Sequence, residues 1–171
     1  MRINKGKRLA AAGVVVAALS GGAVAAGSSQ ADAAPPAARC GTVNPVSATR
    51  TSTVRSTYVT TGGHRIRIEL RQGYIGGRQY GWARITNASG GRLTPGDRVW
   101  LDVTNNGART WTGPCGTRVA RGEESVLYTA AVRTSSSSQY QLSAVGGIPR
   151  YRQSGRFVVQ RDLLAGRTSW W

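Results

Sequence analysis

Acidic residues, histidine and cysteine are scarce in this chain of 171 residues, which holds 7 Asp and Glu against 23 Lys and Arg, 1 His and 2 Cys. So few carboxylates and imidazoles leave little material for acid–base catalysis, and 1 His with 2 Cys cannot close a four-ligand zinc shell. A sustained helical period and a Gly-rich phosphate loop are missing as well. These absences argue against a large multidomain enzyme and against a protein built on long βαβ units. We expect neither a cofactor nor a metal.

The first 33 residues have the pattern of a secretory signal peptide. A cationic start precedes an apolar run over residues 9–19, and Ala31-Asp32-Ala33 offers a small-x-small cleavage site. A membrane anchor is the alternative, but the run is shorter than the roughly 20 residues that a spanning helix needs. Because the start lacks paired arginines, we expect secretion by the general route, with cleavage after Ala33 and no membrane span.

Removal of this segment changes the charge balance. Basic residues fall from 23 to 19, acidic residues from 7 to 6, and the net charge from +16 to +13, carried entirely by arginine. Codon bias in a GC-rich genome and selection for the forked guanidinium group both explain arginine in place of lysine. Codon bias does not explain the shortage of acids, and a surface of this charge favours anionic polymers as ligands.

Cys40 and Cys115 are the two cysteines, and both follow the expected export signal. In an oxidising compartment such a pair predicts a disulfide, which contributes roughly 4 kcal/mol for a loop of this length in the chain-entropy model. A catalytic thiol is the less favoured alternative. Trp111 precedes Cys115 by four residues and is expected to pack on the disulfide.

Alternation of apolar and charged residues over positions 64–71 is the clearest strand pattern in the chain. The residues expected to face a core are Ile66, Ile68 and Leu70. Gly73 and the pair Gly76-Gly77 are expected to form a turn, after which residues 80–86 return as a second strand. The outward positions of this strand are Tyr80, Trp82 and Arg84.

Further short strands are expected at residues 53–60, 97–104, 109–112, 125–132, 139–144 and 156–160, with a hairpin at Asn105-Asn106-Gly107 and turns at Gly90-Gly91 and Gly146-Gly147. Seven or eight such strands predict an all-β fold, a small antiparallel β-sandwich or barrel stapled by one disulfide. Residues 34–52 are expected to form an extended N-terminal segment and residues 53–171 the sandwich domain.

Arginine alternates with aromatic residues at the outward positions of these strands, and the strand at 97–104 is expected to continue the same face. Trp, Tyr and Arg dominate binding hot spots, and exposed Trp is costly otherwise. The residues expected to form a binding surface are Arg67, Arg71, Tyr80, Trp82, Arg84 and Trp100. In the alternative interpretation, favoured for at least one of the two tryptophans, they lie in the core while arginines pair with Glu69 and Asp102 at its rim.

Catalytic interpretations are weaker. A serine hydrolase needs a His held by an acid and facing a nucleophile, and the sequence has no Gly-x-Ser-x-Gly elbow. A small secreted ribonuclease is the best enzymatic rival, because His64 and Glu69 with nearby arginines could act on a phosphodiester. The two residues have opposite strand parity, so their side chains are expected on opposite faces.

Six short blocks are spread over most of the chain after the signal, namely residues 54–56, 68–73, 80–85, 96–100, 128–132 and Thr168-Ser169-Trp170-Trp171. They resemble a family of small secreted actinobacterial proteins that share a Glu-Leu-Arg…Trp-Ala-Arg hairpin and often end in Cys-Thr-x-Trp-Trp. The resemblance implies the small adaptor subunit of the umbrella-shaped toxin particles of Streptomyces, which links a lectin-like subunit to a long scaffold. Arg167 stands here where the family has a Cys.

Together these features predict a secreted, non-catalytic binding module with an extracellular protein partner, most simply an adaptor or accessory subunit of an assembly. A cationic binder of anionic cell-envelope polymers or nucleic acid is the second interpretation, and the ribonuclease is the third. Polymer binding should weaken steeply with salt, whereas a desolvated aromatic contact should not.

Overall fold

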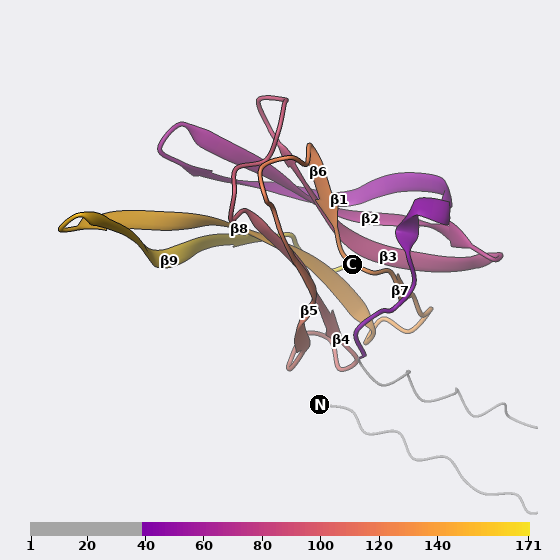
Figure 1. Ribbon diagram of the computed structural model, residues 1–171. Helices are drawn as coiled ribbons and strands as arrows, with labels where there is room; N and C mark the ends of the chain where they lie inside the picture. The colour runs from indigo at the N-terminus through magenta and orange to yellow at the C-terminus, as the bar shows by residue number, and fades with distance from the viewer. Residues whose placement is uncertain (1–38) are drawn as a thin grey trace, which may run out of the picture. The chain divides into compact units, whose positions relative to one another are not determined.

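The computed structural model describes residues 39–171, so the expected signal peptide, its cleavage site and residues 34–38 lie outside the described residues. Figure 1 shows two antiparallel sheets. One holds β1 (Thr49–Thr61), β2 (His64–Ile75), β3 (Arg78–Asn87), β6 (Val126–Tyr128) and β7 (Val132–Arg133). The other has the order β5 (Thr112–Val119), β4 (Arg98–Thr104), β8 (Gln141–Ser154) and β9 (Phe157–Arg167). The predicted β-sandwich is confirmed, and its sheets do not close into a barrel.

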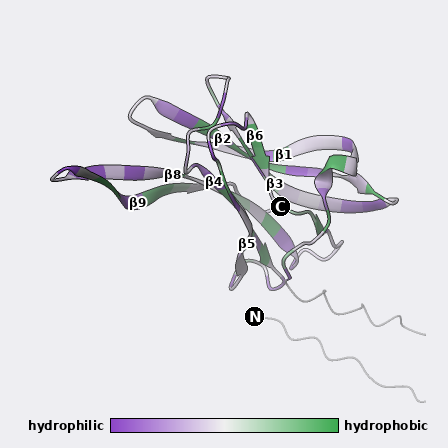
Figure 2. Ribbon diagram, viewed as in Figure 1, coloured by the Kyte–Doolittle hydropathy of each residue, from purple (hydrophilic) through white to green (hydrophobic). Residues whose placement is uncertain are grey.

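Both sheets face one shared apolar core. The three β2 residues predicted to be inside, Ile66, Ile68 and Leu70, are 0% exposed. Successive side chains of a strand point to opposite sides, so the period-two pattern decides which face is buried. The other strands contribute mainly Ala83, Ile85, Val99, Leu101, Val103, Leu142, Ala144 and Ile148. Figure 2 shows the resulting alternation of apolar and polar residues along the strands.

Glycine pairs close the hairpins of the five-stranded sheet. Gly76-Gly77 joins β2 to β3 with φ values of 57° and 76°, a backbone conformation that glycine adopts without a Cβ clash. The predicted turn at this pair is confirmed, but Gly73 lies inside β2. A Cβ there would be 3.0 Å from the Trp82 ring, so this glycine provides space rather than a turn.

The predicted turn at Gly146-Gly147 is also wrong, since both glycines lie inside β8. A Cβ at Gly146 would be 2.7 Å from Ile68 and 2.9 Å from Ile85. The missing side chain therefore lets β8 approach the facing sheet closely.

β3 and β4 belong to different sheets, although they are consecutive in the chain. β3 pairs with β2, β6 and β7, whereas β4 pairs with β5 and β8. The prediction that the strand at 97–104 continues the face of the β2–β3 hairpin is therefore wrong. The link after Asn87 crosses from one sheet to the other, and this crossing places Trp100 on the outer side of the opposite sheet.

The second half of the chain differs most from the expected strands. Residues 109–111 form a loop, and the strand expected at 125–132 is divided into β6 and β7. β8 and β9 are much longer than the expected strands at 139–144 and 156–160, and they pair from Val145 with Arg167 out to Ser154 with Phe157.

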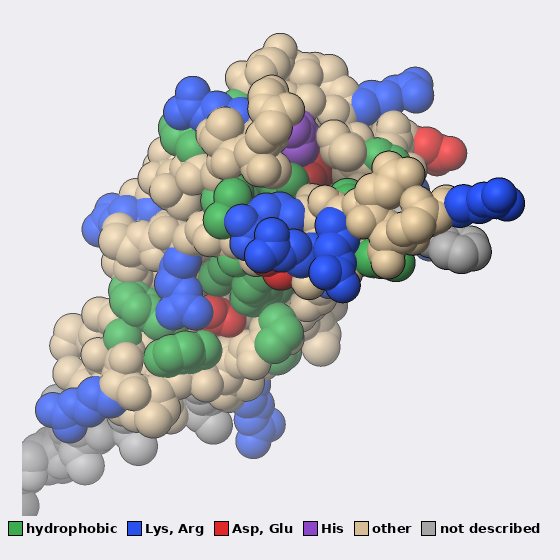
Figure 3. All heavy atoms as spheres, turned by 90° about the vertical axis from the view of Figure 1, so that its left-hand side faces the viewer, with side chains coloured by type: hydrophobic (Ala, Val, Ile, Leu, Met, Phe, Trp, Pro, Cys, Tyr) green, Lys and Arg blue, Asp and Glu red, His purple; other side chains and the backbone are tan. Residues whose placement is uncertain are grey.

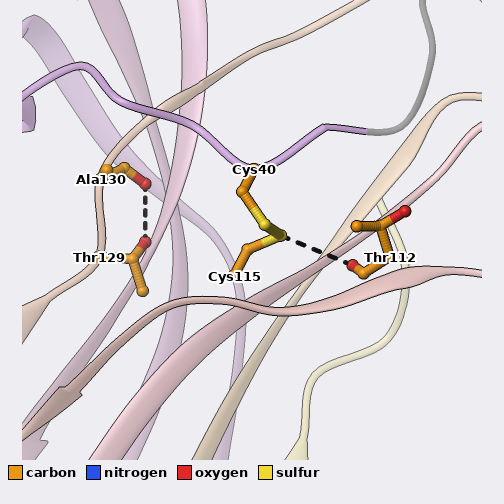
Figure 4. The surroundings of a disulfide bond; sticks show 5 residues. All are labelled: Cys40, Thr112, Cys115, Thr129 and Ala130. Carbon is orange, nitrogen blue, oxygen red and sulfur yellow. Dashed lines mark hydrogen bonds between the residues drawn. A yellow bond between two sulfur atoms is a disulfide. The ribbon is translucent and has the colours of Figure 1, made fainter.

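The predicted disulfide between Cys40 and Cys115 is confirmed, and it ties the N-terminal segment to β5 (Figure 4). Val43 then pairs with Ala131, and the short 3-10 helix η1 (Pro45–Ser47) follows. The described part of the N-terminal segment is therefore anchored along its length. β1 begins at Thr49, earlier than the expected domain boundary at residue 53.

Candidate binding surfaces

A buried carboxylate lies on the outer face of the five-stranded sheet. Glu69 is 1% exposed although it points away from the core. Its Oε2 accepts a hydrogen bond of 2.7 Å from Arg84 Nε, and Arg84 Nη2 lies 2.5 Å away. Its Oε1 accepts from Thr53 Oγ1 at 2.9 Å, and Arg67 Nη2 lies at 3.4 Å. Because Glu69 and Arg84 are direct cross-strand partners, the sheet register itself forms this pair.

Arg71 and Trp82 are the next cross-strand pair on this face. Arg71 donates hydrogen bonds to the hydroxyls of Thr53 at 2.5 Å and Thr51 at 3.3 Å. It forms no ion pair with a carboxylate among residues 39–171. Burial lowers the pKa of Arg71, and the neighbouring Arg84 lowers it further, against a smaller opposing effect of Glu69. This guanidinium therefore lies in a region with an excess of positive charge.

Trp82 fits neither interpretation of the sequence. It is 5% exposed, yet it lies on the outer face, beside a basin of about 210 Å³ at the N-terminal segment. The residues lining this basin are Pro45, Val46, Thr51, Arg71, Trp82, Arg84, Val126 and Tyr128. The ring is thus buried outside the sandwich core, while two arginines stay at the rim of the basin.

The other two aromatic residues predicted for the binding surface lie elsewhere. Tyr80 is half-buried near the disulfide and lines a separate basin with Cys40 and residues 131–136. Trp100 is half-buried on the outer side of the four-stranded sheet. The structure therefore brings Arg67, Arg71, Trp82 and Arg84 together, and it separates Tyr80 and Trp100 from them.

A second cluster, which we call the tryptophan cluster, consists of Trp100, Asp102, Trp111, Arg167 and Trp170. The guanidinium carbon of Arg167 lies 4.8 Å from the Trp111 ring centre and 5.5 Å from that of Trp170. The Trp111 and Trp170 rings are 6.4 Å apart. Arg167 Nη2 also lies 2.5 Å from Asp102 Oδ2. Arg167 therefore holds the C-terminal segment to β4 through a cation–π and an ionic contact.

Trp111 lies against Arg167 and Trp170 in this cluster and is 51% exposed, so the prediction that it packs on the disulfide is wrong. The sulfur of Cys115 instead lies 3.7 Å from the Thr112 carbonyl oxygen (Figure 4). Trp171 packs against the sandwich core, and its backbone pairs with Leu142. No local sequence signal connects Trp111 with residues so far along the chain, which is why the sequence does not predict the cluster.

The Asp102 carboxylate is 1% exposed, and burial raises its pKa above the ordinary range. The charge of Arg167 and a hydrogen bond from the Trp100 side chain lower the pKa in part, without cancelling the effect of burial. The folded protein therefore holds this proton more tightly than the unfolded chain does. Through this group, the free energy of unfolding is higher below the raised pKa and falls as the pH rises through it.

Replacing Arg167 by Gln is expected to raise the pKa of Asp102 further, because the nearest positive charge is lost. The stability difference between the variant and the original protein should be largest near neutral pH and shrink on acidification, as the unpaired carboxylate becomes protonated. Carboxyl NMR shifts of Asp102 against pH measure the midpoint. Arg150→Gln is the control, because it should leave the Asp102 midpoint in place. An unchanged midpoint in Arg167→Gln contradicts the assignment.

The outer half of the β8–β9 hairpin, residues 150–161, is a third surface, and it extends past the sandwich at the left of Figure 1. Tyr151, Val158 and Val159 are 52%, 67% and 39% exposed on it. The cations of this hairpin and its base are Arg150, Arg152, Arg156 and Arg161, with Asp162 as the neighbouring acid. Figure 3, which faces this end, shows Arg side chains together at the centre of the surface.

This surface was not predicted from the sequence, because the strands expected at residues 139–144 and 156–160 are too short to form the long hairpin of β8 and β9. A signal was present in the Ser154-Gly155 pair, which stands between two runs rich in arginine and strand-forming residues and carries a positive φ at Gly155. An ion pair lies at the base of this hairpin. Arg150 Nε is 2.6 Å from Asp162 Oδ1, and Arg150 Nη2 is 2.5 Å from Asp162 Oδ2.

His64 belongs to a structural pair rather than to a catalytic group with Glu69. Its Nε2 lies 2.8 Å from Oδ2 of the fully buried Asp97, and that oxygen also accepts a hydrogen bond from the Thr94 backbone. The Glu69 carboxylate instead pairs with Arg67 and Arg84 on the outer face of the sheet. The expected opposite orientation of His64 and Glu69 is thus observed, and the two do not form the acid–base pair of a ribonuclease.

Within residues 39–171, no three His, Cys, Asp or Glu side chains lie together in a way that could hold a metal ion. We also find no helix in this part of the chain with the length and apolar character needed to cross a lipid bilayer. Comparison with protein-family models, curated proteins and solved structures found no match.

Proposed function

We propose that this chain is a secreted, non-catalytic binding module that joins protein partners in an extracellular assembly, and that the outer half of the β8–β9 hairpin is its main contact element. The observation that carries the proposal is the exposure of Tyr151, Val158 and Val159 on a hairpin that projects past the sandwich. Exposed apolar side chains with arginine beside them are typical of the centres of protein interfaces.

Two further features support this proposal. The disulfide and the pattern of the first 33 residues favour an oxidising, extracellular location. An adaptor also needs a second contact region, and the tryptophan cluster offers one at the C-terminal segment, where Trp111 is half-exposed. The sequence blocks that resemble the adaptors of umbrella toxin particles support the same kind of role.

Binding to anionic polymers is the second candidate function, because the hairpin is rich in arginine and the whole chain carries a net charge of +16. Such binding depends on counterion release, so it should weaken steeply between low and moderate salt. A contact centred on desolvated valine and tyrosine side chains should persist over that range.

Recovery of the tagged, secreted protein from culture fluid tests the proposal. We expect one protein in stoichiometric amounts with it, retained at moderate salt, and at least about tenfold weaker binding when Val158 is replaced by Ser. Val119→Ser is the matched control, because Val119 is also an exposed valine, at 46%, and lies on β5 outside the hairpin. Recovery of the protein alone, or equal losses in both variants, would contradict the proposal.

A further inference from the structure

We propose that the basin between η1 and the arginines of β2 and β3 binds a carboxylate carried on an apolar stem, such as a Glu side chain or a small aliphatic acid. This site lies on the outer face of the five-stranded sheet, and the inference does not depend on the hairpin of β8 and β9. It rests on the charge, the size and the lining of the basin.

The positive charge of the basin is not balanced by carboxylates within residues 39–171. Arg67 and Arg84 pair with the Glu69 carboxylate, and both of its oxygens already accept hydrogen bonds, from Arg84 and Thr53. Arg71 is left with the hydroxyls of two threonines as its partners. A guanidinium group binds a carboxylate through parallel hydrogen bonds. A carboxylate ligand would therefore supply the negative charge that the threonine hydroxyls do not give to Arg71.

Its size limits the ligand to a small group. The basin is open to solvent and has a volume of about 210 Å³, below the roughly 300–1,000 Å³ that is typical of pockets for drug-sized molecules. The side chain of Arg84 remains 30% exposed at its rim, so a ligand has access from solvent. A side chain or a short-chain acid therefore fits better than a nucleotide or a sugar chain.

The lining selects a carboxylate on an apolar stem over inorganic phosphate. Pro45, Val46, Val126 and the ring of Trp82 make one part of the wall apolar, and Arg71 and Arg84 make the other part cationic. Methylene groups lose water favourably against the first part, while the anionic end pairs with the second. Inorganic phosphate has no apolar portion, so it would gain no favourable contact with the apolar part of the lining.

Titration with sodium propionate, at constant ionic strength set by sodium chloride, tests the site by NMR. We expect saturable shifts of the Nε–H signals of Arg71 and Arg84 and of the Trp82 indole, with a dissociation constant on the order of millimolar. Chloride alone should not reproduce them, and phosphate should bind at least about threefold more weakly. Linear shifts, or tighter binding of phosphate, would overturn the proposal.

Two variants locate the site. Arg71→Gln should abolish saturation, whereas Arg150→Gln, on the other sheet, should preserve it. Val46→Asp is independent of any role of Arg71 in folding, because Val46 is 68% exposed and the new carboxylate would occupy the basin in place of the ligand. We expect propionate to bind at least about tenfold more weakly to this variant. Unchanged affinity in a folded Val46→Asp protein would overturn the assignment.

A short acetylated peptide with one central Glu between valines distinguishes the source of the carboxylate. Binding at least about tenfold tighter than propionate, and lost in the Gln counterpart, supports an acidic segment of a partner protein. Affinity equal to that of propionate supports a free small acid. Loss of partner capture in the Val158→Ser test leaves these titrations unchanged, so the two proposals can fail separately.

Discussion

Replacing Glu69 by Gln is expected to lower the free energy of unfolding by about 3–5 kcal/mol. Glu69 is fully buried, and it is the carboxylate on which Arg84 and Arg67 converge. The amide has nearly the same shape but no charge, and its NH₂ group would point a donor at other donors. The guanidinium groups would then stay close together without a counter-charge. Urea unfolding followed by tryptophan fluorescence measures the difference.

Asp162→Asn is the matched control for this prediction. Asp162 also pairs with an arginine, at 2.5 Å from Arg150, but both side chains are substantially exposed. Exposed ion pairs contribute little to stability, because water already solvates both charges and salt screens them. A loss for Glu69→Gln that is no larger than the loss for Asp162→Asn would show that the buried carboxylate does not hold the outer face together.

The direction in which each β2 side chain points could be predicted from the sequence, because it depends only on local geometry. Alternation over residues 64–71 placed Ile66 and Ile68 inside and Glu69 on the other side, as observed. The turn at Gly76-Gly77 is equally local, since a two-residue type I′ turn requires positive φ at both positions and glycine adopts it freely.

How exposed the side chains on the outer face of the five-stranded sheet are could not be predicted in the same way. Strand parity places Glu69 and Trp82 outside, and parity alone suggests that they are exposed. Both are buried, because register brings arginine across from Glu69 and because Trp82 lies beside the N-terminal segment at Pro45. The disulfide that ties this segment to β5 was predicted, but no local pattern shows that the chain between Cys40 and β1 lies beside Trp82.

Which strands belong to the same sheet could not be predicted from the sequence either. Trp100 has the same strand parity as Trp82, but parity does not say which strands are neighbours. The chain crosses between sheets after β3, so the two tryptophans lie on opposite outer faces. Similarly, Gly146 resembles a turn glycine in sequence, and only the close approach of Ile68 from the facing sheet explains its place inside β8.

Replacement of both cysteines by Ala is expected to lower the free energy of unfolding by about 4 kcal/mol. The bond closes a loop with a sequence separation of 75, so its loss frees much conformational entropy in the unfolded chain. It also has a local effect in the folded protein, since the N-terminal segment would lose its covalent bond to β5 and would keep non-covalent contacts such as the pairing of Val43 with Ala131.

The two effects can be measured separately. Urea unfolding gives the global loss, and hydrogen exchange of the Trp82 indole reports opening of the segment beside it. Reduction of the original protein should reproduce the loss, and reductant should not affect the double variant. If the indole exchanges no faster in the variant, the disulfide stabilises only through the unfolded state. Faster exchange together with weaker propionate binding would instead mean that the disulfide also maintains the carboxylate basin, because η1 forms one of its walls.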